Sequence, residues 1–135
     1  MRYSSVSVPC HPLPFRGVVA AGWPSPAEEE LGDLLSFEEW LLPHKGSSVL
    51  IRVESDAMEG AGILPGDTVI VERGRRARLG HVVVADVDGV WVLRRYTQRN
   101  GRPVLVSAHK NSPVFEPSED LKLIGVVTAV IRKYF

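Results

Sequence analysis

The sequence predicts a mainly β fold: a compact, strongly bent β-sheet domain that carries an extended N-terminal arm and one or two short helices. Three observations predict it. Six runs rich in Val, Ile and Leu follow one another from residue 48 onward. Turn signals separate these runs. The first 26 residues are instead rich in Ser, Pro and Gly, with no sustained period, so we divide the chain into an arm, 1–26, and a β domain, 27–135.

The prolines of the N-terminal arm favour an extended chain over a helix. Pro9, Pro12 and Pro14 interrupt the segment, and no apolar core of a signal peptide is present. No run approaches the roughly 18 apolar residues of a membrane span. The chain contains one cysteine, Cys10, which excludes an internal disulfide and fits a reducing compartment. We therefore expect a cytoplasmic protein that has no contact with a membrane.

Residues 27–42 are the one stretch with helical character. Ser25 can cap this stretch, and Pro43 ends it. Gly32 and Ser36 can divide it into two short helices. The apolar stripe that would pack on the domain consists of Leu31, Leu34, Leu35 and Leu42.

The six β runs are SVLIRVES, DTVIVER, HVVVADV, VWVLRRY, RPVLVSA and LKLIGVVTAVIRKYF. Asp88-Gly89 and Asn100-Gly101 lie between runs and predict tight hairpin turns. Several runs are apolar at consecutive positions, which indicates strands covered on both faces or used in a dimer contact. The long last run is an aggregation-prone edge unless a partner pairs with it or it lies inside the core.

Charge and metal-ligand patterns exclude several classes of function. The formal net charge is +0, so no general attraction to nucleic acid is expected. The run Arg73 to Arg78 could contact phosphate, but with this net charge we interpret it as a solvated loop. His11, His44, His81 and His109 are scattered without ligand spacing. We expect neither a metal nor a cofactor.

The stretch RVESDAMEGAGILPGD, Arg52 to Asp67, is the candidate site. A strand runs into a polar turn, and three glycines then punctuate a short loop. Such a loop can present a reactive side chain. The residue in the presented position, however, is Ala57, which has no reactive group. No serine elsewhere lies in a nucleophile-elbow pattern.

This stretch resembles the serine/lysine autoproteases of the LexA/UmuD family, and most closely the UmuD proteins. That family has a glycine, an acid, the nucleophilic serine and a methionine in succession, then a loop ending in Gly-Ile, two variable residues and Gly-Asp. The corresponding residues here are Ser55, Asp56, Ala57 and Met58, followed by Gly62, Ile63, Gly66 and Asp67. The resemblance implies the fold of the LexA/UmuD C-terminal domain.

Further segments carry the same resemblance. The family's second catalytic element, a strand with a lysine, corresponds to Leu93-Arg94-Arg95-Tyr96. Downstream, the segments with Asn111-Ser112, Phe115 and Ile124-Gly125-Val126-Val127 also resemble the family. Upstream, AAGWPSPA resembles the segment that UmuD proteins cleave, with Ala21-Gly22 as the scissile bond. An ordinary linker is the alternative interpretation of that bond.

The resemblance implies that both catalytic positions are substituted. A serine nucleophile needs a base to accept its proton, and the family uses a lysine kept neutral by burial. Ala57, at the nucleophile position, cannot form an acyl-enzyme. Arg94, at the general-base position, stays protonated. We therefore predict a proteolytically inactive chain, in which Asp56, Met58, Gly62, Gly66 and Asp67 remain as the supporting loop.

Two origins fit the alanine: an engineered replacement of serine, or natural loss. Arg94 and Ser55 also depart from the family pattern, and an engineer needs only one change. We therefore favour natural loss.

The function implied is that of a UmuD-like accessory protein of error-prone translesion DNA synthesis in the SOS response to DNA damage. The family's partners are a second copy of the chain, a Y-family polymerase subunit like UmuC, and the RecA filament; sequence-specific DNA binding is not expected. A truncated LexA-type repressor is the alternative, which we disfavour because 21 residues precede Gly22. An inactive dimerisation module that regulates an active homologue, or a peptidase with another nucleophile, remain open.

Overall fold

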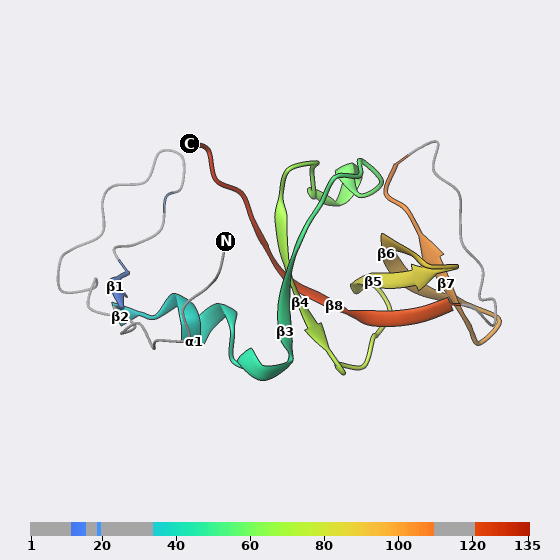
Figure 1. Ribbon diagram of the computed structural model, residues 1–135, viewed down its shortest axis with the longest axis horizontal. Helices are drawn as coiled ribbons and strands as arrows, with labels where there is room; N and C mark the ends of the chain where they lie inside the picture. Colours follow the sequence, from blue (N-terminus) through green and yellow to red (C-terminus); the bar gives the residue numbers. More distant parts are fainter. Residues whose placement is uncertain (1–11, 16–18, 20–33, 110–120) are drawn as a thin grey trace. The chain divides into compact units, whose positions relative to one another are not determined.

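The computed structural model describes residues 12–15, 19, 34–109 and 121–135 (Figure 1). The chain divides into two compact units, Met1–Pro43 and His44–Phe135. The predicted boundary between arm and β domain, after residue 26, lies outside the described residues.

The described residues of the first unit form a small two-stranded sheet and one short helix. Strand β1, Leu13–Pro14, pairs antiparallel with β2, Leu34–Leu35. Helix α1 spans Phe37–Leu41. Ser36 caps it from an extended backbone, with its side chain accepting from the Glu39 N–H at 3.3 Å. No helix in the described part of the chain is long or apolar enough to cross a membrane.

The helix predicted over 27–42 is wrong at two of its positions. Leu34 and Leu35 pair as a strand rather than forming a helical stripe, because the capping Ser36 starts the helix only at the next residue. The predicted division at Ser36 is therefore where the helix begins. Residues 27–33 lie outside the described residues.

The second unit is a six-stranded antiparallel sheet with the order β3-β4-β8-β5-β6-β7. All six predicted β runs form strands, and the mainly β fold is confirmed. Short 3-10 turns lie at Lys45–Ser47 and Glu59–Ala61. The strands are β3 Ser48–Arg52, β4 Thr68–Arg73, β5 Val82–Val87, β6 Val90–Arg99, β7 Arg102–Val106 and β8 Leu121–Ile131.

Both predicted hairpin turns are present. Asp88 and Gly89 have φ of 52° and 84°, and Asn100 and Gly101 have φ of 55° and 77°. Two consecutive residues with positive φ are the requirement of a type I′ turn, whose twist matches that of the flanking strands. These turns join β5 to β6 and β6 to β7.

Strand β8 is the long central strand about which the sheet bends (Figure 1). Its pairing slips by one residue on each side. Ile70 and Val71 of β4 pair with Ala129 and Val127, which leaves Thr128 as an extra residue. The pairing with β5 slips in the same way between Val84 and Ala85. Because each bulge adds local twist and bend, two bulges in one strand explain the strong curvature predicted from the sequence.

The apolar residues of the sheet divide between two buried clusters. Val83 and Val84 are consecutive on β5, yet Val83 belongs to one cluster and Val84 to the other. Successive side chains of a strand point to opposite faces. Strand β5 is therefore covered on both faces, which is one of the two arrangements that consecutive apolar residues predicted.

Replacing Gly125 with alanine should destabilise the second unit. A Cβ there would lie 2.6 Å from the Glu72 carbonyl oxygen and 2.7 Å from Val71 Cγ1, so β4 and β8 would have to separate. We expect Gly125→Ala to lower the free energy of unfolding by about 1–3 kcal/mol, the usual cost of overpacking, in urea denaturation. Gly46→Ala is the control because a Cβ there meets nothing within 4 Å. Equal stability of the two variants would contradict the packing of β8 on β4.

Candidate functional site

The loop between β3 and β4 is closed at its base by backbone hydrogen bonds. The N–H of Val53 donates to the Asp67 carbonyl at 2.8 Å, and the N–H of Gly66 donates to the Val53 carbonyl at 2.7 Å. Gly66 has φ of 95°, a conformation that glycine adopts readily and other residues rarely. The residues between these bonds therefore leave the sheet and return to it at fixed points.

The Asp67 side chain joins this base to the chain that follows β8. Arg132 donates from Nε to Asp67 Oδ1 and from Nη2 to Oδ2, both at 2.7 Å, a bidentate pair. The N–H of Leu64 donates to Oδ2 at 2.8 Å, and Arg132 Nη2 also donates to the Gly62 carbonyl at 2.9 Å. The hydrogen bonds from Arg132 and from the Leu64 N–H lower the pKa of the Asp67 carboxyl to about 2.

Ala57 is buried in the loop and held by its backbone. Its N–H donates to Ser55 Oγ at 3.1 Å, and its carbonyl accepts from the Ala108 N–H at 2.8 Å. Gly60 completes this link by donating to the Ala108 carbonyl at 3.0 Å. A Cβ at Gly60 would collide with that same carbonyl oxygen, so the close approach requires glycine. These hydrogen bonds tie the loop to the segment after β7. The side chain that the loop holds at position 57 is only the methyl group of alanine.

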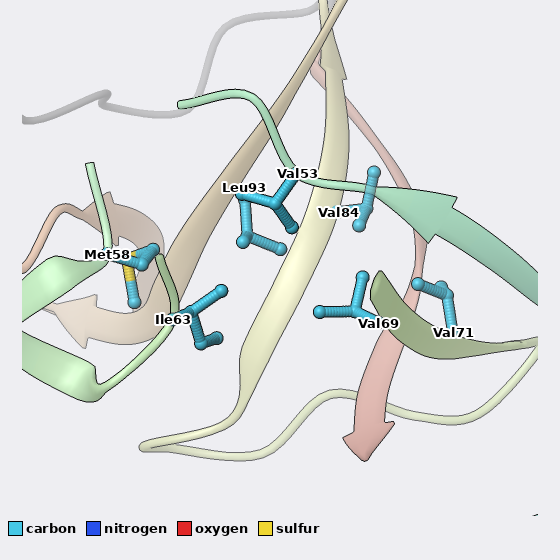
Figure 2. Close-up of a cluster of buried hydrophobic side chains, with 7 residues drawn as sticks. All are labelled: Val53, Met58, Ile63, Val69, Val71, Val84 and Leu93. Carbon is cyan, nitrogen blue, oxygen red and sulfur yellow. The ribbon is translucent and has the colours of Figure 1, made fainter. Parts of the chain in front are cut away.

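Two residues of the β3–β4 loop anchor this loop in the core. Met58 and Ile63 are buried, 1% and 3% exposed, in the cluster that also contains Val53 and Leu93 (Figure 2). Met58 is adjacent to Ala57 in the chain, and Leu93 is adjacent to Arg94. Met58, next to the predicted nucleophile position, and Leu93, next to the predicted base position, therefore belong to the same buried cluster.

Arg94 is a buried cation on β6. Arg94 is 8% exposed, and its Nη1 donates to the Leu93 carbonyl at 2.7 Å. Burial lowers the pKa of the guanidinium, because the charged form loses solvation. A guanidinium begins from so high a pKa that it remains protonated in proteins. Arg94 therefore supplies positive charge and hydrogen-bond donors, and it cannot accept a proton as a base.

A cavity of about 150 Å³ lies beside Arg94. Ser55 contributes a hydroxyl to its lining, and Trp91, which is 55% exposed, contributes an aromatic side chain. The remaining lining residues come mainly from β3 and the middle strands. Its wall combines apolar side chains with three charged residues, Arg52, Glu54 and the buried Arg94.

The sequence did not single out all the residues that shape this region. Arg132, which fixes Asp67, is 65 positions away in the chain, and Trp91 has no local pattern that marks it. Asp56, predicted as loop support, is exposed and lies 3.6 Å from His109 Nε2.

The predicted scissile bond, Ala21-Gly22, lies outside the described residues. Over the described ranges, no group of three or more His, Cys, Asp or Glu residues could hold a metal ion.

Comparison with known proteins places this loop and sheet in a family. Residues 14–128 match the model described as "Peptidase S24-like". That match covers most of the 135 residues, so the chain belongs to the peptidase S24-like family. This match supports the relationship to the LexA/UmuD family that the sequence predicted.

Three curated relatives illustrate the similarity. The chain is 38% identical over 124 residues to a LexA repressor of Gluconacetobacter diazotrophicus, 35% identical over 123 residues to LexA repressor 2 of Nocardia farcinica, and 32% identical over 124 residues to a LexA repressor of Clostridium perfringens. Each alignment covers 90% of this chain. The chain spans about half of the first two relatives, 49%, and 60% of the third.

The stability of the second unit should depend on pH through Asp67. The pKa of its carboxyl is about 2 in the folded state, against an ordinary 3.8, so the folded state favours the ionised form. The stabilisation is complete above roughly pH 5 and is lost as the pH falls toward 2. We expect Asp67→Asn to be less stable than the wild type at neutral pH and to lose less stability on acidification, as measured by denaturation between pH 7 and pH 2.

The matched control for this prediction is Asp88→Asn. It also removes one carboxylate, at an exposed position of a type I′ turn that accepts asparagine. This control should keep the wild-type dependence of stability on pH. An Asp67→Asn variant with the same acid dependence as the wild type would show that the Arg132 contact does not set that dependence.

Proposed function

We propose that this chain is a proteolytically inactive member of the S24-like family that acts by binding other proteins in the SOS response. The observation that carries this proposal is the pair of residues at the two catalytic positions: the buried alanine Ala57 and the buried arginine Arg94. Hydrolysis of a peptide by this type of site needs an oxygen nucleophile and a neutral base. The proposed assignment leaves the chain with neither.

The retained architecture supports a binding role. The loop that would carry a nucleophile is fixed by Asp67, by Ala108 and by the buried Met58. A cavity lined by apolar side chains and by the charged residues Arg52, Glu54 and Arg94 lies next to it. A frame kept in this state can still receive an extended peptide, because affinity for a peptide does not depend on the ability to cleave it.

The specific role that we propose is that of a UmuD-like accessory protein of error-prone translesion DNA synthesis. Its support is the sequence resemblance of the segment around Ala21-Gly22 and of the Ala57 loop to UmuD proteins. In this role the chain forms a homodimer and binds a Y-family polymerase subunit like UmuC and the RecA filament. The exposed apolar side chains at the C-terminal end, Val130, Ile131, Tyr134 and Phe135, favour burial against a second chain.

A second candidate function is that of the C-terminal part of a LexA-type repressor. The observation that favours it is the name of the three relatives given above, all LexA repressors. In this role the chain would assemble on an operator and, lacking the dyad, would resist the self-cleavage that ends repression. It differs from the UmuD-like role in requiring sequence-specific DNA recognition.

Restoring both catalytic groups tests the proposed assignment. We expect Ala57→Ser combined with Arg94→Lys to cleave its own chain near Ala21-Gly22 in the presence of RecA filaments on single-stranded DNA, as followed by mass spectrometry. The wild type and each single variant should remain intact, because the serine and the neutral lysine act as a unit. Self-cleavage of the wild type would contradict the proposed inactivity. An intact double variant would contradict the assigned positions.

Binding measurements separate the two candidate roles. For the UmuD-like role, we expect the purified chain to bind a Y-family polymerase subunit, whereas the repressor role does not require this binding. Light scattering at micromolar concentration should give the mass of a dimer. A preference for the operator of the order of a thousandfold, the usual range for specific DNA recognition, would contradict the UmuD-like role and support the repressor.

A further inference from the structure

A second hollow, distinct from the cavity beside Arg94, lies where the β4–β5 loop meets β6. Its volume is about 360 Å³, within the range of small-ligand sites. We call it the basic hollow. It shares no lining residue with the cavity beside Arg94. The residues that line it are Arg76, Ala77, Arg78, Leu79, Tyr96 and Gln98.

The polar groups of the basic hollow are mainly hydrogen-bond donors. Arg76 and Arg78 are exposed and carry guanidinium groups, which donate and never accept. Gln98 Nε2 donates to Tyr96 Oη at 3.4 Å, which leaves the phenolic hydrogen available to a further acceptor. None of the six residues that line the hollow is acidic. This chemistry selects an anion with several acceptor oxygens.

The loop that carries the two arginines is held in place. Ala77, between them, packs on the buried cluster that contains Tyr96. The N–H of Arg78 donates to His81 Nδ1 and the N–H of His81 donates to the Arg78 carbonyl, both at 3.0 Å. The N–H of Gly80 donates to the Tyr96 carbonyl at 2.9 Å. Because the backbone is already ordered, less conformational entropy is lost when a ligand binds.

Positive charge continues beyond the hollow. Arg99, next to Gln98, is paired in register with Arg102 across the β6–β7 hairpin, and both are exposed. Arg73, the last residue of β4, and Arg75, in the β4–β5 loop, precede the hollow, and Arg75 Nη1 lies 3.0 Å from Glu72 Oε2. Since the whole chain has a formal net charge of +0, the positive charge is concentrated locally. A run of anionic groups matches this arrangement better than one isolated anion.

We propose that the basic hollow and its neighbouring arginines bind the phosphodiester backbone of a nucleic acid without regard to sequence. An arginine fork matches the oxygens of a phosphate, and backbone phosphates receive most sequence-independent protein contacts. The hydroxyl of Tyr96 and the amide of Gln98 are further donors in the lining of the hollow. The arginines from Arg73 to Arg78 are exposed, as expected for a solvated loop, and Ala77 and His81 fix this loop against the sheet.

The test uses the full chain and a fluorescently labelled single-stranded DNA of mixed sequence, with binding followed by fluorescence anisotropy at several salt concentrations. We expect Arg76→Ala combined with Arg78→Ala to weaken binding on the order of tenfold at low salt. Because two phosphate contacts are removed, the slope of log affinity against log salt should fall by about 1.4. Gln98→Glu, which places a carboxylate in the hollow without changing its size, should also weaken binding.

The matched control is Lys122→Ala combined with Lys133→Ala, which removes the same charge from exposed positions outside the hollow. It should change the affinity less than twofold. Equal losses in the two double variants would overturn the proposal, because the attraction would then be general. Absence of binding by the wild type would overturn it as well.

Competition distinguishes other anions. An unlabelled strand of scrambled sequence should compete as well as the original. A mononucleotide that competed equally well would overturn the proposal that the ligand is a polymeric nucleic acid. A glutamate polymer of the same length that competed equally well would overturn the proposed phosphate chemistry and point to an acidic protein segment.

Discussion

The bidentate pair between Asp67 and Arg132 is the contact on which the geometry of the candidate site depends. Asp67 ends the loop that carries Ala57, and Arg132 follows the long strand β8. The same guanidinium reaches the Gly62 carbonyl, and the same carboxylate accepts from the Leu64 N–H. One ion pair therefore fixes the returning half of the loop to the strand about which the sheet bends. Without it, the backbone bonds to Val53 would hold the base of the loop alone.

Under the proposed assignment of Ala57 and Arg94, this frame holds neither the serine nor the lysine that its family uses. Ala57 is locked by Ser55 and Ala108, and its methyl group is buried. Arg94 occupies a desolvated position in which a lysine would lose its proton readily, whereas a guanidinium keeps its charge. The same burial that favours catalysis with lysine therefore favours a fixed positive charge with arginine. Under the proposed function, the cavity beside this charge serves to bind a peptide.

Much of the fold follows from local patterns, and the remainder depends on contacts between distant residues. The turns at Asp88-Gly89 and Asn100-Gly101 were predictable because only certain residues tolerate positive φ at both positions. Consecutive apolar residues such as Val83 and Val84 predicted coverage of both faces. The pairing of Leu34 with Pro14 was missed, because nothing near Leu34 marks its partner. The Asp67–Arg132 pair, and the meeting of Arg76 and Arg78 with Tyr96 and Gln98 in the basic hollow, were missed for the same reason: each forms only when the strands assemble.

The most direct test of the account is a crystal structure of the variant that combines Ala57→Ser with Arg94→Lys. If the loop and β6 keep a catalytic frame, the introduced serine Oγ and lysine Nζ should lie within hydrogen-bonding reach, about 2.6–3.2 Å apart, with the Asp67–Arg132 pair unchanged. A separation of several ångströms more, with that pair intact, would contradict the claim that Ala57 and Arg94 occupy the two catalytic positions of a retained peptidase site.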